Sequence, residues 1–419
     1  MRAVSPSSSG RLAALHSRDF RLLFFGQIVS LTGSQMQTVA VPYQIYQLTH
    51  SSLALGLIGL CRVVPVVLFA LGGGVIADAL DRRRLMILSQ SLMAACSVTL
   101  ALTTRSGHLT PAVMYAVLAV GGAALSLDSP ARQSLIPLLV PREHLANALS
   151  LHAMAWELAA IGGPALAGLL IAWRGVVPIY ALDAVSFAAV IGALLLLHHR
   201  APPRTSANIS VQAALDGLRF LRRSPLILST MVLDFVATFF AGAMLLMPIY
   251  AERILAVGPR GLGLLYAAQP IGAALAAATL AARPTIRRQG ATVLWSVAIY
   301  GGAIAAFGVS PWLPLSLLLL AVSGAADTVS MVVRQTLRQL LTPDELRGRM
   351  TSVNMIFFIG GPQLGEFEAG VVARAAGPRF AVASGGIACV VAVVVAALAL
   401  PSLRRLTSAD YGVDSGARS

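Results

Sequence analysis

Residues 131–143 read Ala131-Arg-Gln-Ser-Leu-Ile-Pro-Leu-Leu-Val-Pro-Arg-Glu143, and residues 333–345 read Val333-Arg-Gln-Thr-Leu-Arg-Gln-Leu-Leu-Thr-Pro-Asp-Glu345. Seven positions are identical at a constant offset of 202 residues. Further along each copy, Ile161-Gly-Gly-Pro164 matches Ile359-Gly-Gly-Pro362. Similarity between apolar helices often arises by chance, but a shared polar loop of this length does not. The repeat therefore predicts a chain built from two related halves.

Long apolar stretches with short polar breaks fill the rest of the chain. A helix needs about 20 apolar residues to cross a bilayer. Each loop copy follows the fourth stretch of a set of six and leads into the fifth. The sequence thus predicts an all-α integral membrane protein with twelve transmembrane helices in two pseudo-symmetric six-helix halves. We expect the spans near residues 22–47, 53–77, 85–104, 110–129, 146–172, 176–197, 225–251, 261–281, 291–309, 312–333, 350–372 and 380–400.

The composition agrees with a membrane location. Of 419 residues, 57% are hydrophobic and 11% are charged, and the mean hydropathy is +0.78. Soluble domains carry about 25% charged residues, so lipid must face much of this chain. Its three cysteines lie far apart in apolar stretches without any metal-ligand spacing, and we therefore expect neither a disulfide framework nor a metal site.

The arginines predict the orientation in the membrane. The chain contains no Lys, and its net charge of +14 comes from Arg. If the N-terminus is cytoplasmic, 24 of the 31 arginines fall in cytoplasmic segments and six on the opposite face, with Arg62 inside a span. Cytoplasmic loops of membrane proteins are enriched in this way. We expect a multi-pass protein of a bacterial cytoplasmic membrane with both termini inside, and a charge that serves topology rather than nucleic-acid binding.

The longest polar break, residues 198–224, falls at mid-chain and carries a short amphipathic run. Such a run suits a helix that lies on the membrane interface. This predicts an N-terminal half at 1–197, a cytoplasmic linker at 198–224, and a C-terminal half at 225–419 that ends in a short cytoplasmic tail.

A second motif lies between the second and third spans. It reads Gly72-Gly-Gly-Val-Ile-Ala-Asp78-Ala-Leu-Asp81-Arg82-Arg83-Arg84. This segment resembles the loop signature GxxxDxxxRR of the major facilitator superfamily. The loop that begins at Pro130 resembles the PARQxLxPxLVPxExLxNA pattern of the branch that holds the enterobactin exporter and related multidrug permeases. The resemblance covers nearly the whole chain and implies a secondary transporter that works by alternating access.

The resemblance also implies a cytoplasmic gate. Glycines such as Gly74 let two helices approach closely, as small residues do in membranes. In the family, an acid and an arginine at the positions of Asp78 and Arg82 act together with an acid at the end of the fourth span, where Asp128 stands here. The alternative is that the arginines of this loop serve only the topology.

Ionisable residues inside spans are costly and are functional candidates by default. Arg62, Glu157 and Asp234 fall about ten residues inside their spans, near mid-depth. A carboxylate there can carry a proton, and Arg62 can pair with an acid across a cavity, so these three are the candidates for proton coupling. A structural ion pair that locks helices together is the alternative. The remaining ionisable residues within spans are Asp183, Asp327, Glu366 and Glu368.

The first span is unusually polar, which favours contact with a water-filled cavity rather than lipid. By family resemblance the first, fourth, seventh and tenth spans line that cavity. The candidates on the first span recur at helical spacing and are Gln27, Ser34, Gln37 and Thr38. On the seventh span, Phe235 and Phe239 lie beside Asp234 and are expected on the opposite wall.

These observations favour a proton-coupled exporter of a small amphipathic organic molecule, such as a drug, a siderophore or a secondary metabolite. A solute importer or symporter of the same fold is the alternative. HExxH, GxSxG and P-loop motifs are absent, so an enzyme or an ATP-driven pump is not expected. A receptor would leave the repeat unexplained. The expected partners are the substrate, lipid and a proton gradient, without nucleic acid or cofactor, for a protein that acts as a monomer.

Overall fold

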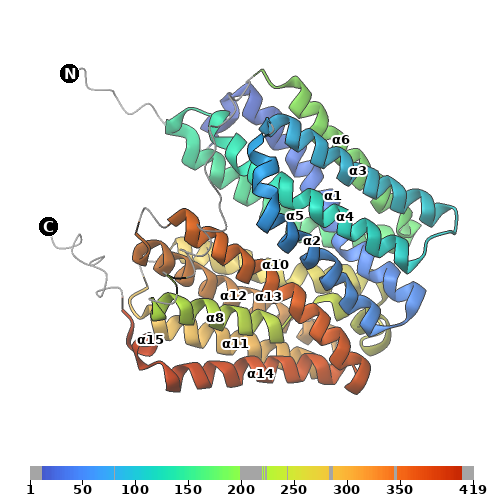
Figure 1. Cartoon of the computed structure of the whole chain (residues 1–419). Coiled ribbons are helices and arrows are strands. Elements are labelled where there is room, and N and C mark those ends of the chain that lie inside the picture. Colours follow the sequence, from blue (N-terminus) through green and yellow to red (C-terminus); the bar gives the residue numbers. More distant parts are fainter. Residues whose placement is uncertain are drawn as a thin grey trace, which may run out of the picture. The chain divides into compact units, whose positions relative to one another are not determined.

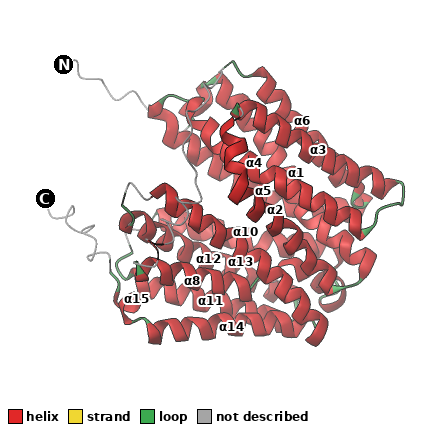
Figure 2. Cartoon of the chain, in the orientation of Figure 1, coloured by secondary structure: helices red, strands yellow, loops and turns green. Residues whose placement is uncertain are grey.

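The computed structural model describes residues 12–79, 81–198, 219, 221, 224–242, 244–282, 286–343 and 347–407. At residues 69–79, 347–349, 351–356, 358–359 and 402–403 it describes the backbone alone. Within these ranges the chain forms helices joined by short loops, and no strand is present (Figure 2). The predicted all-α fold is confirmed.

The N-terminal part of the described chain contains six long helices, which are labelled in Figure 1. They are α1 (Arg18–Thr49), α2 (Ser52–Ala79), α3 (Arg82–Arg105), α4 (Pro111–Leu135), α5 (Leu145–Arg174) and α6 (Val177–Leu196). Short 3-10 turns are η1 (Ala13–His16) before α1, and η2 (Ile136–Leu138) and η3 (Arg142–His144) between α4 and α5. Each of the first six predicted spans falls on one of these helices.

The C-terminal part follows the same pattern with one interruption. Its long helices are α8 (Pro225–Phe240), α10 (Gly258–Ala281), α11 (Gln289–Val309), α12 (Leu313–Leu341), α13 (Arg347–Ala376) and α14 (Pro378–Ala399). The short elements are η4 (Met244–Leu246), α9 (Met247–Ile249), the π-helical turn η5 (Tyr250–Ile254) and α15 (Pro401–Arg405). Nearly all of the predicted 198–224 linker, including its amphipathic run, lies outside the described residues.

Nine helices in the described ranges are long and apolar enough to cross a membrane. The first helix, α1, is not among them, in keeping with the Gln, Ser and Thr residues along it. In α2 the described apolar portion, Ser52–Leu68, is shorter than the others.

The seventh span differs from its prediction as one continuous helix over 225–251. Helix α8 ends at Phe240, and Ala241 and Gly242 are not helical. Pro248 has no N–H to donate to the carbonyl four residues earlier, and the backbone of Gly385 in α14 packs against the Phe240 carbonyl so closely that a side chain there would overlap it. Broken helices of this kind occur at the substrate and ion sites of transporters.

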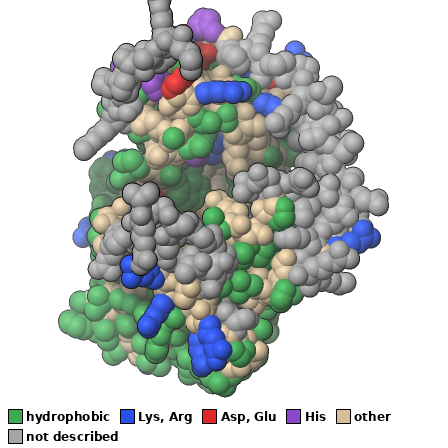
Figure 3. All heavy atoms as spheres, turned by 90° about the vertical axis from the view of Figure 1, so that its left-hand side faces the viewer, with side chains coloured by type: hydrophobic (Ala, Val, Ile, Leu, Met, Phe, Trp, Pro, Cys, Tyr) green, Lys and Arg blue, Asp and Glu red, His purple; other side chains and the backbone are tan. Residues whose placement is uncertain are grey.

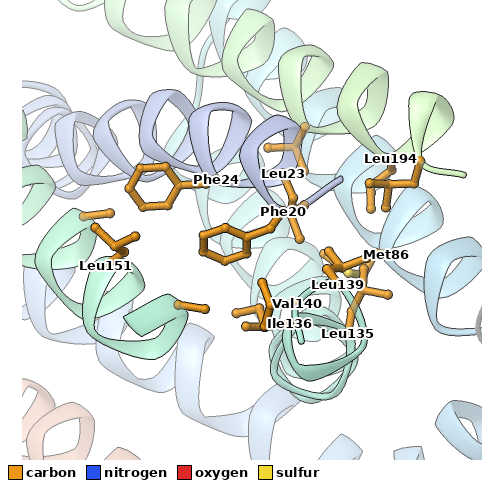
Figure 4. Packing of buried hydrophobic residues seen from close by; sticks show 14 of the residues in the cluster. Phe20, Leu23, Phe24, Met86, Leu135, Ile136, Leu139, Val140, Leu151 and Leu194 are labelled. Atoms are coloured by element: carbon orange, nitrogen blue, oxygen red, sulfur yellow. The ribbon is translucent and has the colours of Figure 1, made fainter. Parts of the chain in front are cut away.

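The first copy of the repeated loop is part of the hydrophobic core. Leu135, Ile136, Leu139 and Val140 are buried in one cluster with side chains of α1, α3, α5 and α6. Figure 4 shows Phe20 of α1 pointing into this group. The apolar positions of the repeat therefore fix the α4–α5 loop against four helices, which accounts for their spacing.

The motif between the second and third spans ends in a helix cap. Asp81 is the N-cap of α3, and its Oδ1 accepts a hydrogen bond from the backbone N–H of Arg83 at 3.0 Å. An acid at this position favours the positive end of the helix dipole. Asp81 thus has a structural role that the sequence pattern did not indicate.

The chain divides into two compact units. The first unit comprises residues 1–40 and 64–207, and the second comprises 41–63 and 208–419. Both division points near residues 40 and 63 lie beside a proline inside a helix, Pro42 in α1 and Pro65 in α2. Proline removes a backbone hydrogen bond of the helix, so the hydrogen-bond ladder of each helix is interrupted close to the division point.

The surface carries more basic than acidic side chains, as the sequence requires with 31 arginines against 17 acids. Figure 3 shows one face, on which arginines (blue) stand among hydrophobic side chains (green) and acidic side chains (red) are few.

Candidate functional site

A cavity of about 290 Å³ lies in the second unit, at the side of α8 that faces α12. Residues of α12 spaced three and four apart lie on one helix face, which is why one turn after another of α12 reaches this cavity. Helix α8 contributes Thr230, Met231 and Asp234, and α12 contributes Met331, Arg334, Gln335 and Arg338.

Charged side chains dominate the cavity wall. Arg334 Nη2 lies 2.6 Å from Asp234 Oδ1 and 3.9 Å from Asp327 Oδ1, so two carboxylates share one guanidinium. The Arg334 and Asp234 side chains are only 11% and 17% exposed, so this pair is poorly screened by solvent. Arg338 is in electrostatic range of Asp234, yet no carboxylate of the described residues lies within 4.0 Å of it.

This arrangement leaves Arg338 as the group most available to a ligand. Arginine presents several N–H donors in a planar fork that matches the two oxygens of a carboxylate. Met231 and Met331 add flexible apolar surface that adapts to irregular ligands. The cavity is therefore chemically suited to an amphipathic molecule with an acidic group.

Phe235 and Phe239, predicted as cavity residues, lie on α8 but are not among the residues that line this cavity. Phe235 and Phe239 stack with ring centroids 5.9 Å apart, and Phe357 of α13 meets Phe235 edge-on at 5.9 Å. Both α8 rings are half-buried. At Gly361 an added Cβ would lie 2.6 Å from Thr238 Oγ1, so glycine permits the close approach of α13 to α8 that brings these rings together.

In the first unit, Asp128 of α4 lies in a fully buried polar cluster. It accepts hydrogen bonds from Ser89 Oγ at 3.1 Å and Gln90 Nε2 at 2.9 Å, and it forms an ion pair with Arg132 one turn along α4. Arg132 was not among the residues predicted from sequence, although its i,i+4 spacing from Asp128 was a usable signal.

The predicted gate is only partly described. Gly74 and Asp78 lie in α2, but their surroundings are outside the described side chains. Arg82 Nη1 donates to the backbone carbonyl of Ser134 at 3.1 Å, near the end of α4. Arg82 therefore reaches the helix that carries Asp128, while the relay between Asp78, Arg82 and Asp128 stays a prediction.

A second buried acid in the first unit, Asp183, belongs to a hydrogen-bond network with two predicted cavity residues, Ser34 and Gln37. Asp183 of α6 accepts from Ser97 Oγ at 2.6 Å and from Ser34 Oγ at 3.4 Å, and Gln37 Nε2 donates to Ser97 Oγ at 3.2 Å. Thr38 Oγ1 instead donates to the backbone carbonyl of Ser34 at 3.1 Å.

The remaining predicted residues occupy different surroundings. Gln27 is buried, and its Nε2 has no hydrogen-bond partner in the described part of the chain. Glu157 is exposed on α5. Arg62 is half-buried on α2 and interacts electrostatically with Glu366 of α13, which belongs to the same unit. Of the three coupling candidates, only Asp234 lines the cavity.

Arg334 and Arg338 were missed as site residues for a traceable reason. The predicted tenth span ended at residue 333, so both arginines were counted with the loop that follows. Helix α12 continues to Leu341, which places both on the cavity face of the helix. Their spacing of four residues was the available signal.

Comparisons with known proteins agree with this architecture. The sequence profile of the family described as transmembrane secretion effector matches residues 9–413. The enterobactin exporter EntS of Shigella boydii serotype 18 is 28% identical over 386 residues, which cover 92% of this chain and 92% of that protein. EntS of Escherichia coli O81 gives the same identity and coverage.

Solved transporter structures share the fold. A bacterial homologue of the iron transporter ferroportin in an inward-facing state superposes with a TM-score of 0.69 at 17% identity, covering 93% of this chain and 99% of that one. A POT family transporter in complex with 5-aminolevulinic acid gives a TM-score of 0.71 at 12% identity, covering 92% and 97%. At such identities the likeness shows the fold alone.

The family profile spans almost the entire chain, and the relatives matched over most of their length are exporters. The predicted resemblance is thereby confirmed, as is the expectation of a transporter rather than an enzyme. The chain belongs to the transmembrane secretion effector family of the major facilitator superfamily, and it is a multi-pass membrane protein that acts as a secondary transporter of small molecules.

Proposed function

We propose that this transporter is a proton-coupled exporter of an amphipathic organic molecule with an acidic group, of the kind that siderophores represent. The carrying observation is Arg338, a cationic side chain in a cavity of about 290 Å³ with no ion-pair partner among the described residues. The similarity to an enterobactin exporter supports a siderophore-like substrate.

The cavity chemistry explains how such a substrate binds. An acidic group pairs with Arg338 and competes with Asp234 and Asp327 for Arg334. Charge-assisted hydrogen bonds of this type are stronger than neutral ones. Met231 and Met331, which line the cavity, offer apolar contact to the remainder of the molecule.

The wider organisation follows from the sequence. We place the protein in a bacterial cytoplasmic membrane as a monomer with both termini cytoplasmic, on the arginine distribution. The six-helix halves at 1–197 and 225–419, joined by the cytoplasmic linker 198–224, rock during alternating access. Gly74, Asp78, Arg82 and Asp128 form the cytoplasmic gate.

One observation favours the alternative of a proton symporter. Asp234 neutralises Arg334 only while it is ionised, so a proton on Asp234 frees Arg334 for an acidic substrate. By linkage, proton and substrate then favour each other's binding in this cavity. In a symporter, proton and substrate strengthen each other's binding in this way. An exchanger instead needs a second proton site, at which a bound proton weakens substrate binding.

The test is transport in proteoliposomes with an imposed pH gradient, using enterobactin as the probe. Exchange predicts that enterobactin moves toward the acidic side, against the direction of proton flow, and symport predicts movement with the protons. Arg338→Gln should abolish both, while Gln335→Ala, at a neutral neighbour on the same wall, serves as the matched control. Wild-type transport that ignores the gradient would reject proton coupling.

A further inference from the structure

Asp183 is a fully buried carboxyl group that the proposed cavity does not use. It is the seventh residue of α6, and its side chain faces α1 and α3. Helices α3 and α6 pack along each other within the first unit (Figure 1). The group is therefore enclosed by helices of one compact unit.

Neutral hydroxyls provide the hydrogen bonds to this acid. Ser97 Oγ lies 2.6 Å from Oδ2 and Ser34 Oγ lies 3.4 Å from Oδ1. An ionised carboxylate offers about four acceptor sites, and only one of the two bonds is short. These two hydrogen bonds are few for an ionised carboxylate. They are sufficient for a neutral acid, whose own O–H can donate to a serine oxygen.

No cation of the described residues forms an ion pair with this carboxylate. The charged residues of α1 and α3 lie at least eight positions along the helix from Ser34 or Ser97, which is about 12 Å at 1.5 Å per residue. These are Arg18, Asp19 and Arg21 in α1, and Arg82, Arg83, Arg84 and Arg105 in α3.

The other titratable neighbours are also unsuited to pair with it. Helix α5 contacts α6 and carries a half-buried His152, with Glu157 and Arg174 exposed. Tyr180 on α6 and Cys96 on α3 are the titratable groups nearest in sequence, and both are neutral at physiological pH. An unpaired ion buried in this way costs several kcal/mol, so such a group takes up a proton instead.

The packing beside Asp183 links its charge to helix position. At Gly33 of α1, an added Cβ would lie 2.7 Å from Ser186 Oγ and 2.9 Å from Asp183 Oδ1. Helix α1 therefore packs against α6 so closely at Gly33 that no side chain fits there beside the carboxyl. Ionised Asp183 needs additional donors, and a movement of α1 away from α6 would let water supply them.

We propose that Asp183 is a proton-binding site of this transporter, whose proton occupancy holds α1 against α6 and whose ionisation loosens that contact. The proposal rests on the proton-coupled function above and names a site for the coupling ion outside the substrate cavity. Gln37 and Ser34 are half-buried. Gln37 donates a hydrogen bond to Ser97, which in turn donates to Asp183, so these bonds connect a less buried region with the acid.

Two independent measurements test the proposal. The first is infrared spectroscopy of the purified protein, in which a protonated carboxylic acid gives its own carbonyl band. Asp183→Asn should remove one such band that disappears in wild type as the pH rises, and Glu157→Gln, at an exposed acid, should leave it unchanged. A spectrum of Asp183→Asn that keeps every wild-type acid band at all pH values would overturn the site.

The second measurement is transport in proteoliposomes. Asn resembles the neutral acid in shape, so Asp183→Asn should insert normally and retain substrate exchange at equal concentrations. Its accumulation of enterobactin driven by a pH gradient should fall at least tenfold. A full gradient-driven rate in Asp183→Asn, beside a gradient-dependent wild type, would reject Asp183 and leave the proposed function intact. A wild type indifferent to the gradient would instead reject the function, while the infrared result still decides the proton site.

Discussion

Asp183 in the first unit and Asp234 in the second are buried aspartates within membrane spans, and their surroundings differ in kind. Asp183 accepts hydrogen bonds from two serine hydroxyls and forms no ion pair with any described residue, whereas Asp234 lies 2.6 Å from Arg334. The first environment favours the neutral acid and the second favours the ionised one. Residue type and depth alone therefore do not assign a function to an acid in a span, because its partners decide its charge.

The two environments respond differently to substitution. Removing one partner of a buried ion pair leaves an uncompensated charge, while replacing a neutral acid by its amide changes no charge. Variants at each site thus separate the two kinds of acid.

The largest effect is expected for Arg334→Leu. This substitution leaves Asp234 without its cation and removes the group that Asp327 shares. The cost of breaking a buried pair is about 3–5 kcal/mol. Thermal unfolding in detergent should show a strong loss of stability, and Arg334→Leu combined with Asp234→Asn should recover part of it. A single variant as stable as wild type would mean that Asp234 is not held as an ion.

Loss of Arg338 should weaken substrate binding without affecting the fold. Its guanidinium forms no ion pair with a described residue, so Arg338→Gln breaks none. A hydrogen bond to a charged group contributes about 1.5–3 kcal/mol, which corresponds to at least a tenfold loss of affinity for enterobactin. Tryptophan-fluorescence or calorimetric titration measures this, with Gln335→Ala as the control. Equal affinities would remove Arg338 from the site.

The fold was largely predictable from sequence, because the apolar spans and the repeated loop are patterns that extend over long stretches of the chain. Eleven of the twelve predicted spans each fall on one long helix, and the seventh falls on α8 and the short helical elements that follow it. The interruption after Phe240 was not predicted, since it depends on the close contact of Gly385 in α14, which is distant in sequence.

The sites were less predictable, because hydrogen-bond partners come from different helices. Ser34 and Gln37 were singled out as cavity residues from the polarity of the first span. The bond from Ser34 to Asp183 and the bond from Gln37 to Ser97 require α6 and α3 to be in place. Arg338 was not identified because the predicted tenth span ended at residue 333, before the end of α12 at Leu341. Glu157 was chosen by depth alone, and depth does not reveal that it is exposed on α5.

A moderate effect is expected for Asp234→Asn on the pH dependence of binding. In wild type, lower pH protonates Asp234 and frees Arg334, so enterobactin should bind more tightly as the pH falls. The amide imitates the protonated acid, so the variant should bind several-fold more tightly at neutral pH and lose most of this dependence. Asp183→Asn should not produce the same change, because its acid faces no cavity arginine. Weaker binding by Asp234→Asn would show that Asp234 contacts the substrate directly.

The smallest effect distinguishes the two serines around Asp183. Ser97 Oγ is 2.6 Å from the carboxyl and also accepts a hydrogen bond from the Gln37 amide, whereas Ser34 Oγ is 3.4 Å from the carboxyl. Losing a hydrogen bond to a buried group costs about 1–3 kcal/mol, and a bond near the distance limit contributes little. Ser97→Ala should therefore lower the stability measurably and shift the pH at which the Asp183 carbonyl band disappears upward, because the ionised form loses its better donor. Ser34→Ala should change both quantities by less. Equal shifts in the two variants, or none in Ser97→Ala, would mean that these hydroxyls do not set the charge of Asp183, and the contrast with the Arg334-paired aspartate would then rest on the missing cation alone.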